Sequence, residues 1–78
     1  MFGFTLASLS EGECAAVRTV ALPGEFKRRL FELGFTPGTQ VRCIRKAPSG
    51  SPVAFSVKGA VIALRNEDCG KIYGTVVG

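Results

Sequence analysis

The sequence has no histidine and no tryptophan, and its single tyrosine is Tyr73. Without histidine, neither a Ser-His-Asp triad nor a histidine-bound metal site can form. No glycine-rich stretch ends in Gly-Lys-Ser or Gly-Lys-Thr, so a Walker A loop for nucleotide phosphates is absent as well. One tyrosine is also too few for an aromatic groove that binds polyproline segments. These absences exclude the commonest catalytic signatures and a generic peptide adaptor.

Long apolar runs are also missing. No stretch approaches the ~20 apolar residues that a membrane-spanning helix needs. The N-terminal segment lacks the basic start of a signal peptide. With 78 residues, the chain has room for one small core, so we expect a single domain over residues 1–78. We expect that domain to be cytoplasmic or to lie on the cytosolic side of a membrane.

Cysteine is sparse, and its pattern does not indicate a metal site. Cys14, Cys43 and Cys69 lie far apart in the sequence, without a Cys-x-x-Cys pair. An odd number of cysteines in a cytoplasmic chain also argues against a disulfide framework. We interpret them as packed thiols and predict no metal site and no cofactor, while metal binding by any of the three stays an open alternative.

Four of the six acidic residues occur as two neighbouring pairs, Glu11 with Glu13 and Glu67 with Asp68, both in turn-like sequence. Neither pair has a partner residue that would separate its pKa values for acid-base work. We therefore predict no catalytic residues and no enzyme. The net charge is +4, but the basic residues are scattered, which favours a solvated surface or a dock for an acidic protein over a nucleic-acid site.

Residues 25–46 are the most informative stretch, because they predict a short helix, a stop, a turn and a strand. Phe26, Leu30 and Leu33 recur at helical spacing and predict one apolar face. Gly34 follows this face directly, where a left-handed residue commonly ends a helix. The next residue is then placed to fold back onto the helix end.

Two further features of this stretch are specific. The acid-first order of Glu25 and Arg29 favours an ion pair between them along the helix. Residues 36–39, Thr-Pro-Gly-Thr, suit a type II turn, with proline and glycine at its central positions. The following strand alternates apolar Val41 and Cys43 with Arg42, as a half-buried strand requires.

Alternating or apolar stretches predict five strands, at residues 14–20, 40–46, 53–58, 60–65 and 71–77. In the first of these, Arg18 implies that Ala15 and Val17 face inward. Thr5 is placed to cap one helical turn at residues 6–9, and residues 66–69 resemble a turn or 3₁₀ segment. Five short strands with one helix after the first describe a mostly-β domain, and closing its sheet into a barrel removes the edges.

The sequence also resembles a known family. Residues 28–39, Arg-Arg-Leu-Phe-Glu-Leu-Gly-Phe-Thr-Pro-Gly-Thr, followed by Arg45–Pro48, Gly50–Pro52 and Val57–Gly59, are similar to the FeoA family of bacterial ferrous iron uptake. The resemblance extends from Thr5 to Ile72. It implies an SH3-like β-barrel with a helix inserted after the first strand. It further implies a cytosolic accessory protein that binds and modulates the GTPase region of the ferrous iron membrane transporter.

Candidate contact residues fall in two places. The first is the charged side of the predicted helix, with Lys27, Arg28 and Glu32, and the second is the connecting loop, with Ser49, Gly50, Ser51 and Pro52. A third possibility is an apolar surface patch for a partner or for weak self-association, made by Phe2, Phe4, Val61 and Ala63. The alternative function is a regulatory SH3-like module that binds a transition metal ion.

Overall fold

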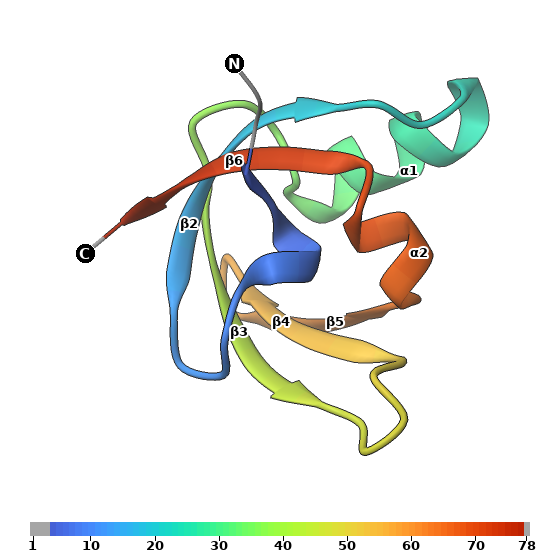
Figure 1. Cartoon of the computed structure of the whole chain (residues 1–78). Helices are drawn as coiled ribbons and strands as arrows, with labels where there is room; N and C mark the ends of the chain where they lie inside the picture. The colour runs from blue at the N-terminus through green and yellow to red at the C-terminus, as the bar shows by residue number, and fades with distance from the viewer. Residues whose placement is uncertain (1–3, 78) are drawn as a thin grey trace.

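The computed structural model describes residues 4–77, which form one strongly bent antiparallel sheet with short helices beside it (Figure 1). The strands are β1 (Phe4–Thr5), β2 (Cys14–Val20), β3 (Gln40–Lys46), β4 (Val53–Val57), β5 (Ala60–Leu64) and β6 (Ile72–Val77). The helical segments are the 3₁₀ turn η1 (Leu6–Ser8), the helix α1 (Gly24–Leu33) and the short helix α2 (Asn66–Cys69). The mostly-β prediction is confirmed, with a helix after the first long strand.

The sheet is open, so the prediction of a closed barrel is wrong. Its strand order is β1-β6-β2-β3-β4-β5, and no ladder joins the edge strands β1 and β5 within residues 4–77. The prediction of five strands also missed β1. Figure 1 shows η1 and α2 between β6 and the β4–β5 pair, and the two helical segments contact each other. Their buried side chains fill this side of the core, and the sheet does not close over it.

The core lies inside the bend of the sheet. Phe35 and Phe55 are its largest buried side chains, and their rings meet edge to face with centroids 6.2 Å apart. β4 buries every second residue, as its alternation predicts. Leu6 and Leu9 are also fully buried. The first helical turn is therefore anchored by its apolar side chains, because Thr5 makes no side-chain capping hydrogen bond there.

The strand β2 confirms the predicted inward-facing residues but does not keep strict alternation along its length. Ala15 and Val17 are fully buried, as expected. The pairing of β2 with β6 then shifts register between Val17 and Thr19. A bulge of this kind inserts an extra residue and changes which side chains face inward. Val20 is consequently buried too, which strict alternation from Val17 does not predict.

The end of α1 is a Schellman stop. Gly34 has φ 112°, its N–H donates to the carbonyl of Phe31 at 3.0 Å, and the N–H of Phe35 donates to the carbonyl of Leu30 at 2.9 Å. The turn at residues 36–39 follows directly, with Gly38 at φ 92° and a 3.0 Å hydrogen bond from Thr39 N–H to the Thr36 carbonyl. The predicted helix end and turn are therefore both confirmed.

The apolar face of α1 differs from the predicted one. Leu30 is fully buried and Phe26 is half-buried, but Leu33 is 39% exposed. The helix stop folds the fully buried Phe35 onto the core beside Leu30, and Leu33 in the last turn is left toward solvent. The prediction for residues 66–69 is also wrong, because they form the short α-helix α2 and not a turn or 3₁₀ segment.

Candidate partner-binding site

The charged side of α1 carries three of the predicted contact residues, and their charges are largely matched within the helix. Arg28 lies 3.9 Å from Glu32 and 4.0 Å from Glu25, through Nε and Nη1 respectively. The predicted Glu25–Arg29 ion pair is therefore replaced by one between Glu25 and Arg28. Lys27 places its Nζ 5.7 Å from the centroid of the Phe31 ring, a cation–π contact. With Arg29 included, α1 presents a mixed row of three cations and two carboxylates.

The loop between β3 and β4 carries the other predicted contacts and is internally ordered. Ser49 Oγ donates to the Ser51 carbonyl at 3.1 Å, and Gly50 N–H donates to the Ala47 carbonyl at 2.7 Å. Ser51 Oγ accepts a hydrogen bond from the backbone N–H of Asn66 at 3.0 Å, which ties the loop to the start of α2. The Ser51–Pro52 peptide bond is cis. The loop therefore has a defined conformation, held by hydrogen bonds within it and by one from the start of α2.

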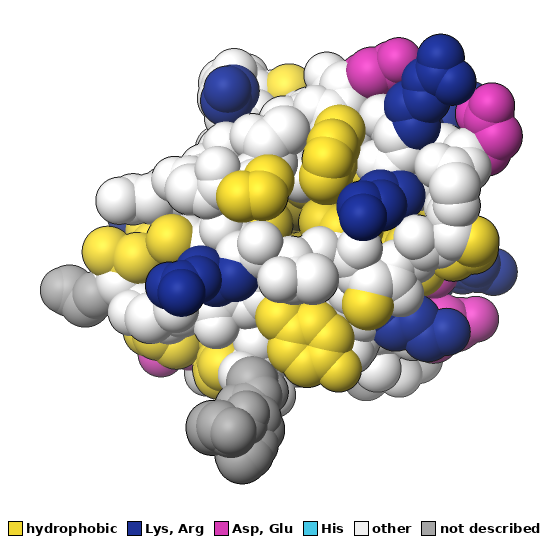
Figure 2. Space-filling view, turned by 90° about the horizontal axis from the view of Figure 1, so that it is seen from above, with side chains coloured by type: hydrophobic (Ala, Val, Ile, Leu, Met, Phe, Trp, Pro, Cys, Tyr) yellow, Lys and Arg dark blue, Asp and Glu magenta, His cyan; other side chains and the backbone are white. Residues whose placement is uncertain are grey.

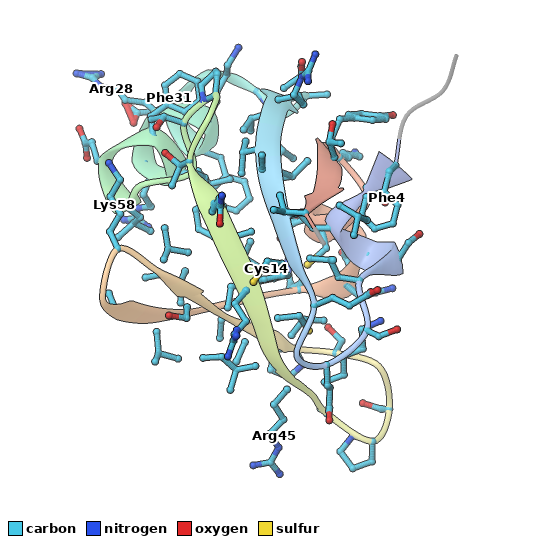
Figure 3. The ribbon with its side chains drawn as sticks, turned by 90° about the vertical axis from the view of Figure 1, so that its left-hand side faces the viewer. Phe4, Cys14, Arg28, Phe31, Arg45 and Lys58 are labelled. Atoms are coloured by element: carbon cyan, nitrogen blue, oxygen red, sulfur yellow. The ribbon has the colours of Figure 1, made fainter. Side chains whose placement is uncertain are left out.

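The two predicted contact regions do not lie together. Figures 1 and 3 both place α1 at one end of the molecule and the β3–β4 loop at the opposite end. In Figure 3, Arg28 lies at the α1 end and Arg45 at the loop end. A small contact surface can therefore include one of these regions, and a partner that covers both must extend along the whole domain.

Each end has a shallow hollow. At the α1 end, Phe26 lines a hollow between Glu25 and Arg29. At the loop end, a mainly apolar hollow is lined by Arg45, Ala47, Pro48, Pro52 and Ala54. Only Pro52 of this second group was among the contact residues predicted from the sequence.

Arg45 reaches this hollow because β3 contains a bulge. The pairing of β3 with β4 shifts register between Cys43 and Arg45, so that Arg45 stands opposite Ala54 on the outer face of the sheet. Ile44, within the bulge, is 41% exposed. The guanidinium of Arg45 has no carboxylate within ion-pair distance among residues 4–77. It is therefore a cation without a matched charge at the edge of an apolar hollow.

The predicted apolar patch is supported only at β5. Val61 is 68% exposed and Ala63 is exposed beside it on the same face. Phe4 is half-buried on β1, at the other edge of the sheet, and packs against the core. Phe2 lies outside the described residues. Of the described residues predicted for this patch, Val61 and Ala63 on β5 are therefore the two that are exposed together.

None of the three cysteines belongs to a cluster of metal-binding side chains among the described residues. Cys43 and Cys69 are fully buried, and Cys14 is half-buried on β2. Burial raises the pKa of the Cys43 thiol, and burial together with nearby Asp68 raises the pKa of Cys69 to about 11. Metals bind the thiolate, so these two sites favour the form that does not coordinate. In the described part of the chain, no three His, Cys, Asp or Glu residues gather as a metal site would require.

The paired carboxylates have structural partners. Glu11 accepts a hydrogen bond from the backbone N–H of Lys46 at 2.8 Å, and Glu13 accepts one from Ser10 N–H at 2.7 Å. Asp68 is buried and accepts a 3.0 Å hydrogen bond from Nε of Arg65. These contacts hold two turns and the start of α2, and they give each of the three carboxylates a structural role.

Charge is dispersed over the surface. In Figure 2, lysine and arginine side chains lie apart on the face shown, with hydrophobic side chains between them and acidic and basic groups together at one corner. A nucleic-acid site needs a continuous basic stripe, which this face does not have. Within residues 4–77, no helix is long and apolar enough to span a membrane.

Comparison with known proteins gives a consistent result. The family model described as the FeoA domain matches residues 4–76. The solution structure of the FeoA protein from Chlorobium tepidum has a TM-score of 0.92 and 28% identity, and covers 96% of this chain and 71% of its own. The zinc-bound crystal structure of Stenotrophomonas maltophilia FeoA, described as a procaryotic SH3 domain protein, has a TM-score of 0.80 and 32% identity, over 91% of this chain and 88% of its own.

A curated relative adds a different kind of information. The Fe(2+) transport protein A/Fe(2+) transporter FeoB fusion protein of Porphyromonas gingivalis is 33% identical over 67 residues, which is 86% of this chain. This chain spans only 8% of the length of that relative. The fold and these matches define a small mostly-β domain of the FeoA type. The chain belongs to the FeoA family.

Proposed function

We propose that this protein is a cytoplasmic accessory subunit of ferrous iron uptake. It binds the cytosolic GTPase region of the ferrous iron membrane transporter and modulates transport or nucleotide turnover. In this role it performs no chemistry of its own. It reaches the membrane only through the transporter.

The observation that carries this proposal is the fusion of the two components in Porphyromonas gingivalis, where the relative of this chain is part of one protein with the transporter. A covalent link raises the effective concentration of one domain at the other to the millimolar range. A domain that is joined to its partner in this way contacts it locally, so we expect a docking face for the transporter on the present chain.

Two surfaces compete for that role. One is the α1 face with Lys27, Arg28 and Glu32, and the other is the loop end with residues 49–52. The loop end has the stronger physical case, because the hollow that Arg45 borders is lined mainly by apolar residues, whereas Glu25 and Arg29 line the α1 hollow beside Phe26. Apolar area supplies binding free energy, while an unmatched charge directs orientation and association rate.

The test is an affinity titration of this protein against the full-length transporter of the same organism in detergent, with and without guanine nucleotide. We expect saturable binding that Arg45→Glu weakens about tenfold or more, in line with loss of one interfacial charge contact. Lys27→Glu reports on the α1 face in the same assay. Arg18→Glu, an equal charge change on β2, is the matched control.

The possible outcomes distinguish an error in the proposed contact surface from an error in the proposed function. If only Lys27→Glu weakens binding, the α1 face is the contact and the preference for the loop end is wrong. Equal weakening by Arg45→Glu and Arg18→Glu would mean that net charge, and not a defined site, drives association. Absence of binding at high concentration, with either nucleotide state, contradicts the accessory-subunit proposal itself.

A second function rests on one observation, the zinc bound to the Stenotrophomonas maltophilia relative. In that alternative the present chain is a metal-sensing or regulatory module. The thiols of Cys14, Cys43 and Cys69 would be the obvious ligands, but two of them are buried with a raised pKa. An anaerobic Fe²⁺ titration decides the matter, because stoichiometric binding that is lost in Cys14→Ser would favour the sensor.

A further inference from the structure

The free edge of β5 is unusual for a sheet edge. Its five residues, Ala60–Leu64, are all apolar, and the strand pairs with β4 alone among the described strands. Natural sheets protect their edges with charged residues, proline, bulges or very short strands. β5 has none of these within its bounds, and its register with β4 is regular. Val61 is 68% exposed, so the described residues leave this edge open to solvent.

The turn before β5 fixes which backbone groups point outward. The two-residue turn Lys58–Gly59 has φ values of 49° and 84°, both positive, as a type I′ hairpin turn requires. The residues that flank such a turn, Val57 and Ala60, form a hydrogen-bonded pair, and bonded pairs alternate from there along the ladder. The N–H and C=O groups of Val61 and Ala63 consequently point away from β4. Among residues 4–77, none of these groups has a hydrogen-bond partner.

We propose that this edge pairs with the β5 edge of a second copy of this chain, antiparallel and with a two-fold axis at Ile62. In this register Val61 stands opposite Ala63 of the second copy, so the unpaired donors and acceptors of each strand satisfy those of the other. Ile62 is half-buried at the open side of the core. It meets its own counterpart in a non-hydrogen-bonded pair, where side chains approach most closely and exclude water.

The charges at the two ends of β5 fit this arrangement. Lys58, at one end, has no carboxylate within ion-pair distance among residues 4–77. At the other end Arg65 lies 3.7 Å from Glu67 and 3.0 Å from Asp68, which leaves one negative charge in excess. Antiparallel pairing brings the Lys58 end of each copy to the acidic end of the other. Opposite charges placed in this way fix the direction and register of two strands.

The cation at the loop end lies far from the Lys58 end of this edge (Figure 3). Lys58 lies at the turn between β4 and β5, whereas Arg45 lies at the far end of β3 and points away from the ribbon. With a net charge of +4 on each copy and a small contact area, we expect weak, reversible association. This inference goes beyond the proposed function and needs no transporter.

The test is sedimentation equilibrium of the full chain from about 10 µM to about 1 mM, a range that covers weak association. We expect a monomer–dimer equilibrium that Val61→Pro weakens about tenfold or more, because proline removes a donor from the free edge. The N–H lost does not belong to the β4 ladder, so the hairpin keeps its own bonds. Val61→Thr keeps the N–H and the branched side chain and is the matched control, with dimerisation within about twofold of the unmodified chain.

A charge-reversal cycle tests the register and does not depend on the proline variant folding. Lys58→Glu alone and Glu67→Lys alone are each expected to weaken dimerisation, and the double variant Lys58→Glu/Glu67→Lys is expected to restore it. A protein that stays monomeric throughout the range overturns the proposal. A dimer that Val61→Pro leaves unchanged also overturns it, because another face then mediates the contact. If the chain is monomeric and Val61→Pro weakens transporter binding, the edge receives a strand from that partner and not from a second copy.

Discussion

The two edges of the sheet, β1 and β5, are built on different principles. β1 has two residues, pairs with β6 and runs directly into the helical turn η1. β5 has five apolar residues and an outer side that no described strand pairs with. A very short edge offers few groups for another strand to pair with, whereas five unprotected residues offer a complete ladder. The difference indicates that one edge of this sheet only ends the domain, while the other is available for contact.

The surroundings of the two edges also differ, because the residues next to β1 are tightly packed and those on β5 are exposed. β6, the neighbour of β1, has Gly74 paired with Phe4 on one side and with Val17 on the other, at a place without room for a side chain. On the β5 side, Val61 and Ala63 are exposed to solvent. We therefore expect substitutions on the β1 side to lower the stability of the fold. Substitutions on the β5 side are expected to change association with another chain.

The largest expected effect is at Gly74. A Cβ there would lie 2.5 Å from the carbonyl oxygen of Ala16, a backbone atom that cannot move without disturbing the β2–β6 ladder. Gly74→Val should cost on the order of 3 kcal/mol of unfolding free energy, by overpacking and loss of strand pairing. Thermal and urea unfolding followed by circular dichroism measures it. Thr75→Val, at the next and exposed position, is the control, and equal stability of the two variants would contradict the close-approach argument.

A smaller effect is expected at Gly34, which connects α1 to the β4–β5 side. Gly34→Val forces a branched residue to φ 112° and places its Cβ 2.7 Å from Cγ1 of Val57. The expected cost is about 1–3 kcal/mol, seen as a lower melting temperature. Gly38→Val is the matched control, because Gly38 also has a positive φ, but a Cβ added there would meet no atom within 4 Å. The difference between the two variants isolates the contact with β4, and no difference would show that this contact is unimportant.

The smallest expected effect concerns Cys69, on the α2 helix between the two edges. Its pKa is raised from 9.0 to about 11, mainly by burial, so the unfolded chain releases the thiol proton at lower pH than the folded one. The contribution of this thiol to stability is therefore complete below about pH 9 and is lost between about pH 9 and 11. Urea unfolding at a series of pH values measures this slope. In Cys69→Ala it should become shallower, and an unchanged slope would assign the effect to other groups.

Several local features could be predicted from the sequence because neighbouring residues determine them. Gly34 and Phe35 formed the expected helix stop, and Gly38 took the positive φ that a type II turn requires. The strands β2 and β3 have the predicted bounds, since apolar alternation is set by burial of one face. The position of Arg45 beside the loop-end hollow was missed, because the bulge before it depends on pairing with β4 and cannot be inferred from the sequence of β3 alone.

The sequence by itself determined the helix, its end, the following turn, the long strands and membership of a recognisable family. Only the tertiary structure decided that the sheet stays open, that Leu33 faces solvent and that the two predicted contact regions lie at opposite ends. The physical reason is how far apart in the sequence the interacting residues lie. Helix stops and turns depend on hydrogen bonds between residues a few positions apart, whereas strand order, bulges and free edges depend on contacts between segments that are distant in the sequence.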